Sequence, residues 1–398
     1  MTKKTIAIIG GGASALMLAS TLNSDKYIIN LYEKNAALGR KFLVAGKGGF
    51  NLTHSENEVD FATRYSPTTF LAPFIAHFSA MDFRTWLSAI GINTYVGTSK
   101  RVFPTKGIKP IQVLRAIENC LANNHVNLHY NYTFNSFTTN ELTFTHHHNE
   151  VAVTADIVVF AIGGASWKVT GSDGAWLNII KNKGIDTENF YPSNCAYKIN
   201  WDTALIKIIE GEALKNVTLS CGILHKKGEV VLTTFGIEGS GIYALSAAIR
   251  PQLLATQVAI VYIDFKPELS TKNIVELLHN RGNLSIKDVL QKKIKLNTTH
   301  IALLKHSTTK EEYNNPQQLC TFIKKYPLHL TGVAPIDQAI STVGGIALHE
   351  IDEHLMLKKM PNHYAIGEML NWDAPTGGYL LQACFSMGKY LGDRLNAM

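Results

Sequence analysis

The sequence has few cysteines and no long apolar run. Its five cysteines are far apart in the chain and form no C-x-x-C pair: Cys120, Cys195, Cys221, Cys320 and Cys384. This usage argues against a disulfide framework, a zinc site and a dithiol redox centre, and it fits a reducing, cytoplasmic compartment. No stretch reaches the roughly 18 apolar residues that a membrane span requires, so we expect no membrane partner.

Charged residues are also sparse and dispersed. Lys and Arg number 38 and Asp and Glu 31, which leaves a formal net charge of only +7. No basic stripe is interleaved with aromatic residues, and this disfavours nucleic acid as a partner. His146, His147 and His148 lie in a polar stretch that predicts the exposed tip of a β-hairpin, since consecutive side chains cannot all converge on one ion. We therefore predict no metal site and a small-molecule substrate.

What the chain does have is a glycine-rich N-terminus, which allows two interpretations. Two lysines and an apolar run are typical of an export signal, but three consecutive glycines would interrupt its apolar core. Alternatively, residues 5–9 form a buried parallel strand, residues 10–15 satisfy G-x-G-x-x-[GA], and a helix follows. Gly10 then allows a tight turn, Gly12 lets a phosphate approach the backbone, and Ala15 permits close helix–strand packing. The helix N-terminus would present free N–H groups to a pyrophosphate.

An acidic residue at the expected distance supports the second interpretation. Residues 26–34 (KYIINLYEK) predict another strand, and Glu33 stands near its end, 18 residues beyond Ala15. A carboxylate at this point accepts hydrogen bonds from an adenosine ribose and disfavours the 2′-phosphate of NADP. The motif, the second strand and the acid together predict a dinucleotide-binding unit.

The segment after Glu33 indicates which dinucleotide binds. Residues 34–56 (KNAALGRKFLVAGKGGFNLTHSE) form a long loop rich in glycine and lysine. Such a loop favours FAD over NAD, because FAD continues past the pyrophosphate. Arg40 and Lys41 can neutralise phosphate, and Asn51 and Thr53 offer polar partners. The glycines that let backbone approach a flat ring or ribityl chain are Gly46, Gly48 and Gly49.

Segments along most of the chain carry a family resemblance. Besides residues 39–56, they are RVFPTKGIKPIQVLRA (101–116), ADIVVFAIGGAS (155–166), TGSDGAWLNIIKNKGI (170–185), GEVVLTTFGIEGSGIYALSAAI (228–249), STVGGIALHEID (341–352) and the stretch 360–392. They resemble a bacterial flavoprotein family that includes aminoacetone-oxidase-like enzymes and bile-acid enone reductases. The resemblance implies an FAD-dependent oxidoreductase that binds its cofactor non-covalently.

One position departs from the family pattern. Many members carry Gly-Arg-Cys-Asn where this chain has Gly48-Gly49-Phe50-Asn51. Phe50 therefore replaces a cysteine, and no role for a thiol near the flavin carries over to this chain. This places the chain in a branch of the family for which the resemblance names no substrate.

The resemblance also implies where the flavin is held. Gly367 and Glu368 match the Gly-Asp position that binds the ribityl chain and pyrophosphate in related flavoproteins, with Glu one methylene longer. A helix opened by Gly377 and Gly378 would direct its positive end at the flavin pyrimidine. The remaining residues predicted to contact the cofactor are Ala13, Ser14, Lys34, Lys47, Leu52, Thr133, Ala161, Gly163, Gly164, Gly345, Tyr379 and Gln382.

The order of these signals predicts the domain organisation. Residues 1–190 and 336–398 would form a discontinuous, Rossmann-like α/β FAD-binding domain, similar to that of glutathione-reductase-like flavoproteins. Residues 191–335 would form an inserted substrate-side domain, because they lack dinucleotide signals. Its first part alternates like antiparallel strands, and its later part has helical periodicity.

Three functions stay open at this level. The first is oxidation of a small amine or alcohol through flavin N5, with O2 or another acceptor. The second is NAD(P)H-dependent reduction of an enone-like substrate, with transient nicotinamide binding. The third is a non-catalytic flavin-binding or RNA-associated protein. The acid–base candidates are Lys47, Asn51 and Tyr379, while His54 fits a loop-packing role better.

Overall fold

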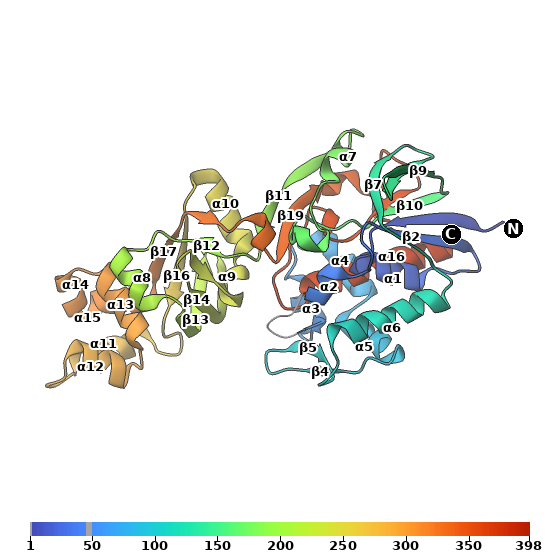
Figure 1. The fold of residues 1–398 in the computed structure, drawn as a ribbon. Helices are drawn as coiled ribbons and strands as arrows, with labels where there is room; N and C mark the ends of the chain where they lie inside the picture. The colour runs from blue at the N-terminus through green and yellow to red at the C-terminus, as the bar shows by residue number, and fades with distance from the viewer. Residues whose placement is uncertain (1, 45–49) are drawn as a thin grey trace. The chain divides into compact units, whose positions relative to one another are not determined.

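The structure is a computed structural model, which describes residues 2–44 and 50–398 (Figure 1). The chain divides into two compact units. Unit 1 comprises Met1–Pro192 and Ile336–Met398, and unit 2 comprises Ser193–Pro335. The sequence predicted an insertion over residues 191–335. Unit 1 therefore contains both the N-terminal glycine motif and the C-terminal glycine turn.

A five-stranded parallel sheet forms the centre of unit 1, in the order β20-β10-β1-β2-β6. The central strand β1 (Lys4–Ile9) is buried over its last four residues, because neighbours pair with it on both edges. The other strands are β2 (Tyr27–Glu33), β6 (Asn127–Tyr130), β10 (Ile157–Phe160) and β20 (His363–Ala365). This parallel order confirms the predicted Rossmann-like α/β class.

Two helices from opposite ends of the chain pack against each other in this unit. They are α1 (Ala13–Thr21), which follows β1, and α16 (Tyr379–Ala397), which ends the chain. A Cβ atom on Gly388 of α16 would lie only 2.3 Å from the carbonyl oxygen of Ser14. Small residues at this crossing let the two backbones come together, so α16 fixes the position of the first turn of α1.

Shorter elements surround the sheet. The helices are α2 (Arg40–Val44), α3 (Glu58–Ala62), α4 (Thr68–His77), α5 (Ala80–Ala89), α6 (Pro110–Asn123) and α7 (Leu177–Lys181). One small antiparallel sheet contains β3 (Thr53–His54), β4 (Thr94–Val96) and β5 (Arg101–Pro104). A second contains β7 (Tyr132–Phe137), β8 (Leu142–His146) and β9 (Asn149–Val153). A two-stranded sheet pairs β11 (Thr187–Ser193) with β19 (Ser341–Ile346). Short 3₁₀ turns cover Lys168–Thr170, Ile336–Gln338, Leu348–Glu350 and Gly367–Met369.

Unit 2 is built on a seven-stranded sheet in the order β17-β16-β13-β14-β15-β12-β18. The strands are β12 (Tyr197–Lys198), β13 (Ala213–Cys221), β14 (Leu224–Leu232), β15 (Gly236–Glu238), β16 (Ala259–Asp264), β17 (Tyr326–Leu330) and β18 (Gly332–Val333). The helices are α8 (Thr203–Ile209), α9 (Ser240–Tyr243), α10 (Ser246–Thr256), α11 (Thr271–His279), α12 (Ile286–Asp288), α13 (Thr298–Ser307), α14 (Lys310–Asn314) and α15 (Pro316–Lys324), with a π-helical turn over Val289–Lys293. Most strands precede the run of helices from α11 to α15, but α8, α9 and α10 lie among the strands, and β17 and β18 return to the sheet after the last helix.

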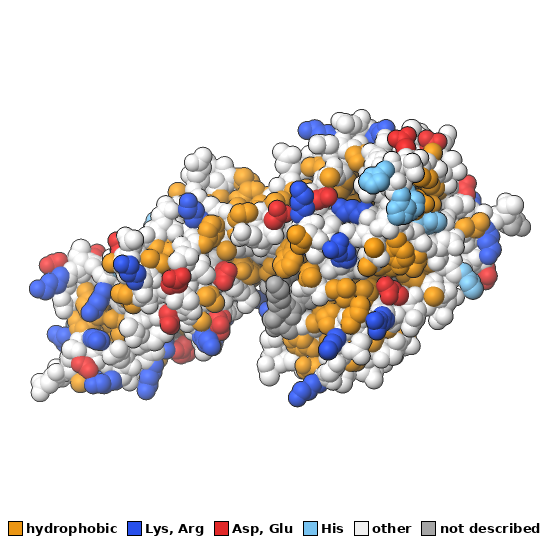
Figure 2. All heavy atoms as spheres, in the orientation of Figure 1, with side chains coloured by type: hydrophobic (Ala, Val, Ile, Leu, Met, Phe, Trp, Pro, Cys, Tyr) orange, Lys and Arg blue, Asp and Glu red, His pale blue; other side chains and the backbone are white. Residues whose placement is uncertain are grey.

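The hairpin predicted around the three consecutive histidines is also present. Strands β8 and β9 pair antiparallel, and His147 and His148 occupy the turn between them with positive φ angles. Such angles are costly for a side chain with a Cβ and are confined to tight turns. Histidine side chains gather on the surface of unit 1 in the face that Figure 2 shows.

Candidate cofactor site

The glycine turn after β1 has the geometry that a bound phosphate requires. Gly10 adopts φ +99°, and a Cβ there would lie 2.4 Å from the carbonyl oxygen of Ala161. A Cβ on Gly12, in contrast, would meet no atom within 4 Å. Gly10 is therefore needed for the fold, whereas Gly12 leaves open space beside the first turn of α1. Free N–H groups at a helix N-terminus make such a space suited to an anion.

Glu33 is fixed beside this turn at the end of β2. Its side chain is buried and accepts hydrogen bonds from the backbone N–H groups of Gly11 and Asn35, both at 2.8 Å. The carboxylate is thus oriented by the backbone on both sides before any ligand binds. Lys34, the next residue, points elsewhere and forms an ion pair of 2.9 Å with Asp173.

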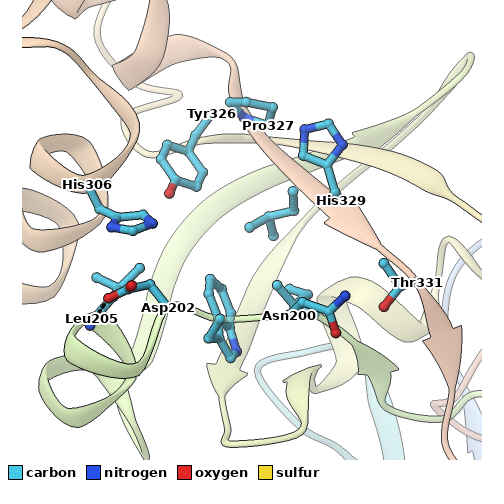
Figure 3. Close-up of a pocket in the computed structure, with 11 residues that line it drawn as sticks. Asn200, Asp202, Leu205, His306, Tyr326, Pro327, His329 and Thr331 are labelled. Atoms are coloured by element: carbon cyan, nitrogen blue, oxygen red, sulfur yellow. Dashed lines mark hydrogen bonds between the residues drawn. The ribbon is translucent and has the colours of Figure 1, made fainter.

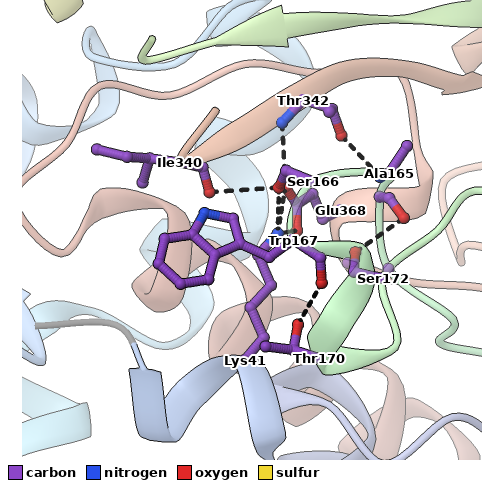
Figure 4. A network of polar contacts seen from close by, with 12 residues as sticks. Lys41, Ala165, Ser166, Trp167, Thr170, Ser172, Ile340, Thr342 and Glu368 are labelled. Carbon is purple, nitrogen blue, oxygen red and sulfur yellow. Dashed lines mark hydrogen bonds and ion pairs between the residues drawn. The ribbon is translucent and has the colours of Figure 1, made fainter. Parts of the chain in front are cut away.

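Lys41 and Glu368 form a polar network at the same end of the sheet (Figure 4). The Lys41 ammonium lies 2.8 Å from a carboxylate oxygen of Glu368 and donates to the Ser166 hydroxyl at 2.8 Å. The backbone N–H of Thr342 donates to the other carboxylate oxygen of Glu368 at 3.2 Å. The Glu368 side chain is 8% exposed. A carboxylate this deeply buried requires such compensation.

The chain after β10 passes close to this network. A Cβ on Gly164 would lie 2.2 Å from the Thr342 hydroxyl oxygen and 3.1 Å from the Glu368 carboxyl carbon. Gly163 adopts φ +76°, and the side chain nearest to a Cβ there is Ser172. Sequence reasoning named the two glycines but missed Ser166 and Thr342, which surround the same carboxylate. Ser166 was inside a segment that carries the family resemblance, so a signal for it existed.

The N-terminus of α16 lies against residues 51–53. Gly378 is the N-cap, and a Cβ there would lie 2.6 Å from the Cα atom of Thr53 and 2.8 Å from the Asn51 amide nitrogen. A Cβ on Gly377 would lie 3.6 Å from the Nε atom of Arg101. The structure thus places Asn51 beside the helix opening, and it adds Arg101, which the sequence did not single out.

Tyr379 is buried and belongs to a hydrogen-bonded cluster next to this opening. Its hydroxyl donates to Glu56 at 2.5 Å, and Arg64 binds the same carboxylate through two hydrogen bonds of 3.0 and 2.8 Å. Burial alone would raise the pKa of Glu56, but the hydrogen bonds from Arg64 and Tyr379 lower it below its usual value. Burial, followed by the nearby Glu56, raises the pKa of Tyr379, so this phenol keeps its proton. His54 stacks on the Tyr379 ring at 5.1 Å.

Several predicted site residues also have contacts within the protein. Gln382, predicted to contact the cofactor, has a fully buried side chain whose amide donates to the Phe78 carbonyl and the Ser386 hydroxyl. Leu52 is equally buried, and a Cβ on Gly345 would lie 2.1 Å from the Met369 carbonyl oxygen. Thr133 lies on β7 with an exposed side chain, opposite Thr145.

The loop expected after Glu33 is partly helical, since residues 40–44 form α2. Arg40 donates to the Asn35 side chain at 2.6 Å from the first residue of this helix. Phe50 packs edge-on against Phe42 at 5.0 Å between ring centroids, as expected for an apolar residue in place of a thiol. Four predicted cofactor contacts lie outside the described residues: Gly46, Lys47, Gly48 and Gly49.

The remaining predicted residues lie at the start of α1 and the end of β10. Ala15 is fully buried, and Ser14 is nearly so, with its hydroxyl beside the Cys384 thiol. Burial, with a smaller effect of Glu368, raises the pKa of Cys384 to about 12, so this thiol stays protonated. Ala13 is partly buried against the core, and the backbone N–H of Ala161 donates to the Ile9 carbonyl at 2.8 Å.

Unit 2 contains a separate pocket of about 220 Å³. Figure 3 shows the residues that line it, including Leu205 on α8, His306 on α13 and His329 on β17. None of the residues predicted to contact the flavin lines this pocket. Elsewhere in the described residues, one group could offer three metal-ligand atoms, namely Asp186, His349 and Glu350, but Lys359 already forms an ion pair with Glu350.

The residues of unit 1 fit a flavin dinucleotide. The open space at Gly12, the preoriented carboxylate of Glu33 and the second carboxylate of Glu368 lie at the carboxyl ends of β1, β2 and β20 or just beyond them. Ligands of open parallel sheets bind at these ends. Gly12 and the start of α1 would hold the pyrophosphate, and Glu33 would hold the ribose.

Comparison with known proteins gives matches along the whole chain. Residues 4–394 match the HI0933-like protein Rossmann domain. A 3-dehydro-bile acid delta(4,6)-reductase from Clostridium scindens is 22% identical over 98% of this chain and 98% of its own length. A ribosomal RNA dihydrouridine synthase from Escherichia coli is 22% identical over 95% of this chain and 94% of its own.

A solved structure supports the fold. A flavocytochrome c3 fumarate reductase in its open conformation matches 99% of this chain and 78% of that chain, with a TM-score of 0.53 and 13% identity. In addition, no helix among the described residues combines the length and apolarity needed to cross a bilayer. The match over nearly all residues confirms the predicted family, and the chain belongs to the HI0933-like Rossmann-domain family of FAD-dependent oxidoreductases.

Proposed function

We propose that this oxidoreductase reduces a carbon–carbon double bond conjugated to a carbonyl group. One observation carries the proposal: two relatives that match nearly the whole chain have names that describe the same chemistry. Reduction of a 3-dehydro bile acid and formation of dihydrouridine both add hydrogen across a double bond activated by a carbonyl. In the sequence analysis, reduction of an enone-like substrate was the alternative to oxidation of an amine or alcohol.

The geometry of unit 1 is compatible with this reaction. The bound flavin would supply hydride transfer. Gly12 and Glu33 would anchor its adenosine half, and the opening of α16 would place N–H groups and a positive helix end near its ring system. The opening is held in place by the Tyr379–Glu56–Arg64 cluster, in which Tyr379 and Arg64 both donate hydrogen bonds to the Glu56 carboxylate.

Reduction of a conjugated double bond also requires a proton at the carbon next to the carbonyl. Phe50 offers no acidic proton, and the Tyr379 hydroxyl donates a hydrogen bond to Glu56 and has a raised pKa. We therefore propose that Tyr379 positions the helix opening and that solvent supplies the proton. A nicotinamide would bind transiently as the hydride source, because the sequence has no second dinucleotide motif.

The test is anaerobic mixing of the purified holoprotein with NADH or NADPH. Bleaching of the flavin, followed by recovery of its absorbance when a 4-en-3-one steroid is added, supports the reductase. Bleaching by a small amine but by neither nicotinamide contradicts it and favours the oxidase. A colourless protein that does not bind added FAD would contradict the cofactor itself.

The cofactor contact has its own variants. Glu33→Ala removes the ribose partner, and we expect FAD affinity to fall about tenfold or more, because hydrogen bonds to a charged group contribute about 1.5–3 kcal/mol. Glu58→Ala is the matched control, since Glu58 is exposed on α3. Equal FAD affinity in the two variants, measured by fluorescence titration, would show that Glu33 does not contribute to FAD binding.

A further inference from the structure

The turn between β13 and β14 exposes an isoleucine that the fold does not use. Cys221 and Leu224 pair across the hairpin, which leaves Gly222 and Ile223 as a two-residue loop. Gly222 adopts φ +56°, as the first position of a type II′ turn requires. Ile223 is 92% exposed. Polar residues are usual at such a turn, so neither turn geometry nor core packing explains this side chain.

The base of this turn is held firmly. The Gln252 side chain on α10 donates to the Cys221 sulfur at 3.1 Å and accepts from the Ile260 backbone N–H at 3.2 Å. Cys221 itself is fully buried. One helix thus ties the hairpin to the neighbouring strand β16, and Ile223 is presented from a fixed base.

Further apolar side chains are exposed near the turn. Ser220 lies opposite Tyr262, so Ile260 lies two residues further along β16 in the direction of the turn. Leu224 is 39% and Ile260 36% exposed, and Val258, just before β16, is 40% exposed. Leu224 pairs with Cys221 and shares its face of the sheet, whereas Ile260 is on the face of Ser220 and Tyr262, so apolar side chains are exposed on both sides of the tip. We call these four residues at the tip the hairpin patch: Ile223, Leu224, Val258 and Ile260.

Basic residues adjoin the hairpin patch. His225, Lys226 and Lys227 follow it directly on β14, and all three side chains are exposed. The whole of unit 2, residues 193–335, contains 17 Lys and Arg against 11 Asp and Glu, a net charge of +6 out of the chain's +7. Figure 2 shows Lys and Arg side chains over the visible face of the unit that contains α11 to α15.

We propose that the hairpin patch binds the surface of an anionic membrane. An apolar tip inserts into the interface while neighbouring cations attract acidic headgroups, and two such signals together are needed for stable anchoring. Charge complementarity favours an anionic partner over a neutral one, and the exposed apolar tip favours a lipid surface among anionic partners because it can insert there. The expectation of no membrane partner was based on the lack of a spanning segment, which has no bearing on surface binding.

Vesicle sedimentation with the full-length holoprotein tests the proposal. We expect binding to vesicles of phosphatidylcholine with phosphatidylglycerol, weaker binding to pure phosphatidylcholine, and a decrease as salt is raised. Ile223→Asn should lower the affinity for the mixed vesicles about fivefold or more, because Asn suits the turn but cannot insert. Lys227→Gln should reduce the preference for anionic vesicles.

Val59→Asn is the matched control, because Val59 is 79% exposed on α3 in unit 1. It should bind vesicles like the unchanged protein. Unchanged melting temperatures of both variants show that folding is preserved. Equal vesicle binding by the Ile223 and Val59 variants would overturn the proposal. So would a protein that ignores both vesicles, or one that ignores them and binds single-stranded RNA through the hairpin patch instead.

Discussion

The two units differ in whether they bury carboxylates. In the described part of unit 1, four carboxylates are buried, namely Glu33, Glu350, Glu368 and Asp373. In unit 2 no carboxylate is buried to that degree, whereas each unit buries one histidine, His363 in unit 1 and His300 in unit 2. Unit 1 is also close to neutral, whereas unit 2 has a net charge of +6. Buried carboxylates with backbone or lysine partners hold loops in fixed positions, and that is what a cofactor site requires.

This difference implies that different changes destabilise the two units. Unit 1 should be sensitive to substitutions that disturb close backbone approaches or leave a carboxylate without its partner. Unit 2, which buries no carboxylate, should respond to acid mainly through His300, since a buried neutral histidine opposes protonation. Each of the following experiments either sharpens or contradicts this contrast.

The largest effect is expected at Gly10. Gly10→Ala places a Cβ 2.4 Å from the Ala161 carbonyl oxygen at a positive φ, and we expect a loss of about 2–5 kcal/mol in the free energy of unfolding. Gly12→Ala meets open space and should leave the stability of the apoprotein unchanged while weakening FAD binding. Denaturation of the apoprotein and FAD titration measure the two quantities. A stable Gly10→Ala protein would contradict the tight turn.

Acid should affect unit 2 through His300. Burial, with the nearby Lys266, lowers the pKa of His300 to about 4, against 6.5 for a free histidine. In the unfolded chain His300 therefore binds a proton below pH 6.5, whereas in the folded chain it binds that proton only near pH 4. Stability should fall by roughly 2–3 kcal/mol in total between these values and be unaffected above them.

Urea denaturation from pH 7.5 to 4 measures this loss. His300→Gln should flatten the pH dependence in this window, whatever its stability at pH 7.5. His225→Gln is the control, because His225 is exposed on β14 and should leave the dependence as it is. An unchanged profile in the His300 variant would show that another group causes the acid sensitivity.

The Lys41–Glu368 pair tests the role of buried carboxylates in unit 1. Lys41→Met leaves the Glu368 carboxylate without its cation, and we expect a loss of about 1–3 kcal/mol in stability. Adding Glu368→Gln should recover part of that loss, since the uncompensated charge is then gone. Lys34→Met removes the more exposed pair with Asp173 and should cost less than about 1 kcal/mol. Equal losses of stability in the Lys41→Met and Lys34→Met variants would contradict the prediction that the more buried ion pair contributes more.

The smallest effect is expected at Tyr379. Tyr379→Phe removes one hydrogen bond to Glu56 and should cost about 1 kcal/mol in the free energy of unfolding. Because the folded-state pKa of Glu56 is lowered, this cluster contributes fully above about pH 4.5 and loses its contribution as the pH falls through the lowered value. Melting curves from pH 7 to 3.5 should therefore converge for the two proteins at the acid end. If the two proteins differ in stability by the same amount at every pH, ionisation of Glu56 does not contribute to the difference.

Sequence reasoning succeeded where spacing along the chain carries the information. Gly10, Gly12 and Glu33 belong to one strand–turn–helix–strand unit, so their separations alone place them together. It did not reveal that Gln382 donates to the Phe78 carbonyl, because a periodic helix does not show which polar side chain faces another helix or loop. It also missed Glu56 and Arg64, since their partner Tyr379 stands more than 300 residues away.

The sequence by itself determined the parallel βαβ unit, the family and the interruption of the Rossmann-like unit by an insertion. Those features depend on local periodicity and on short glycine motifs. Only the tertiary structure decided that Lys41 pairs with Glu368, that Glu56 orders the opening of α16, and that Ile223 stands exposed beside basic residues. Each of these depends on side chains brought together from distant elements, and burial rather than residue type sets the electrostatic environment there.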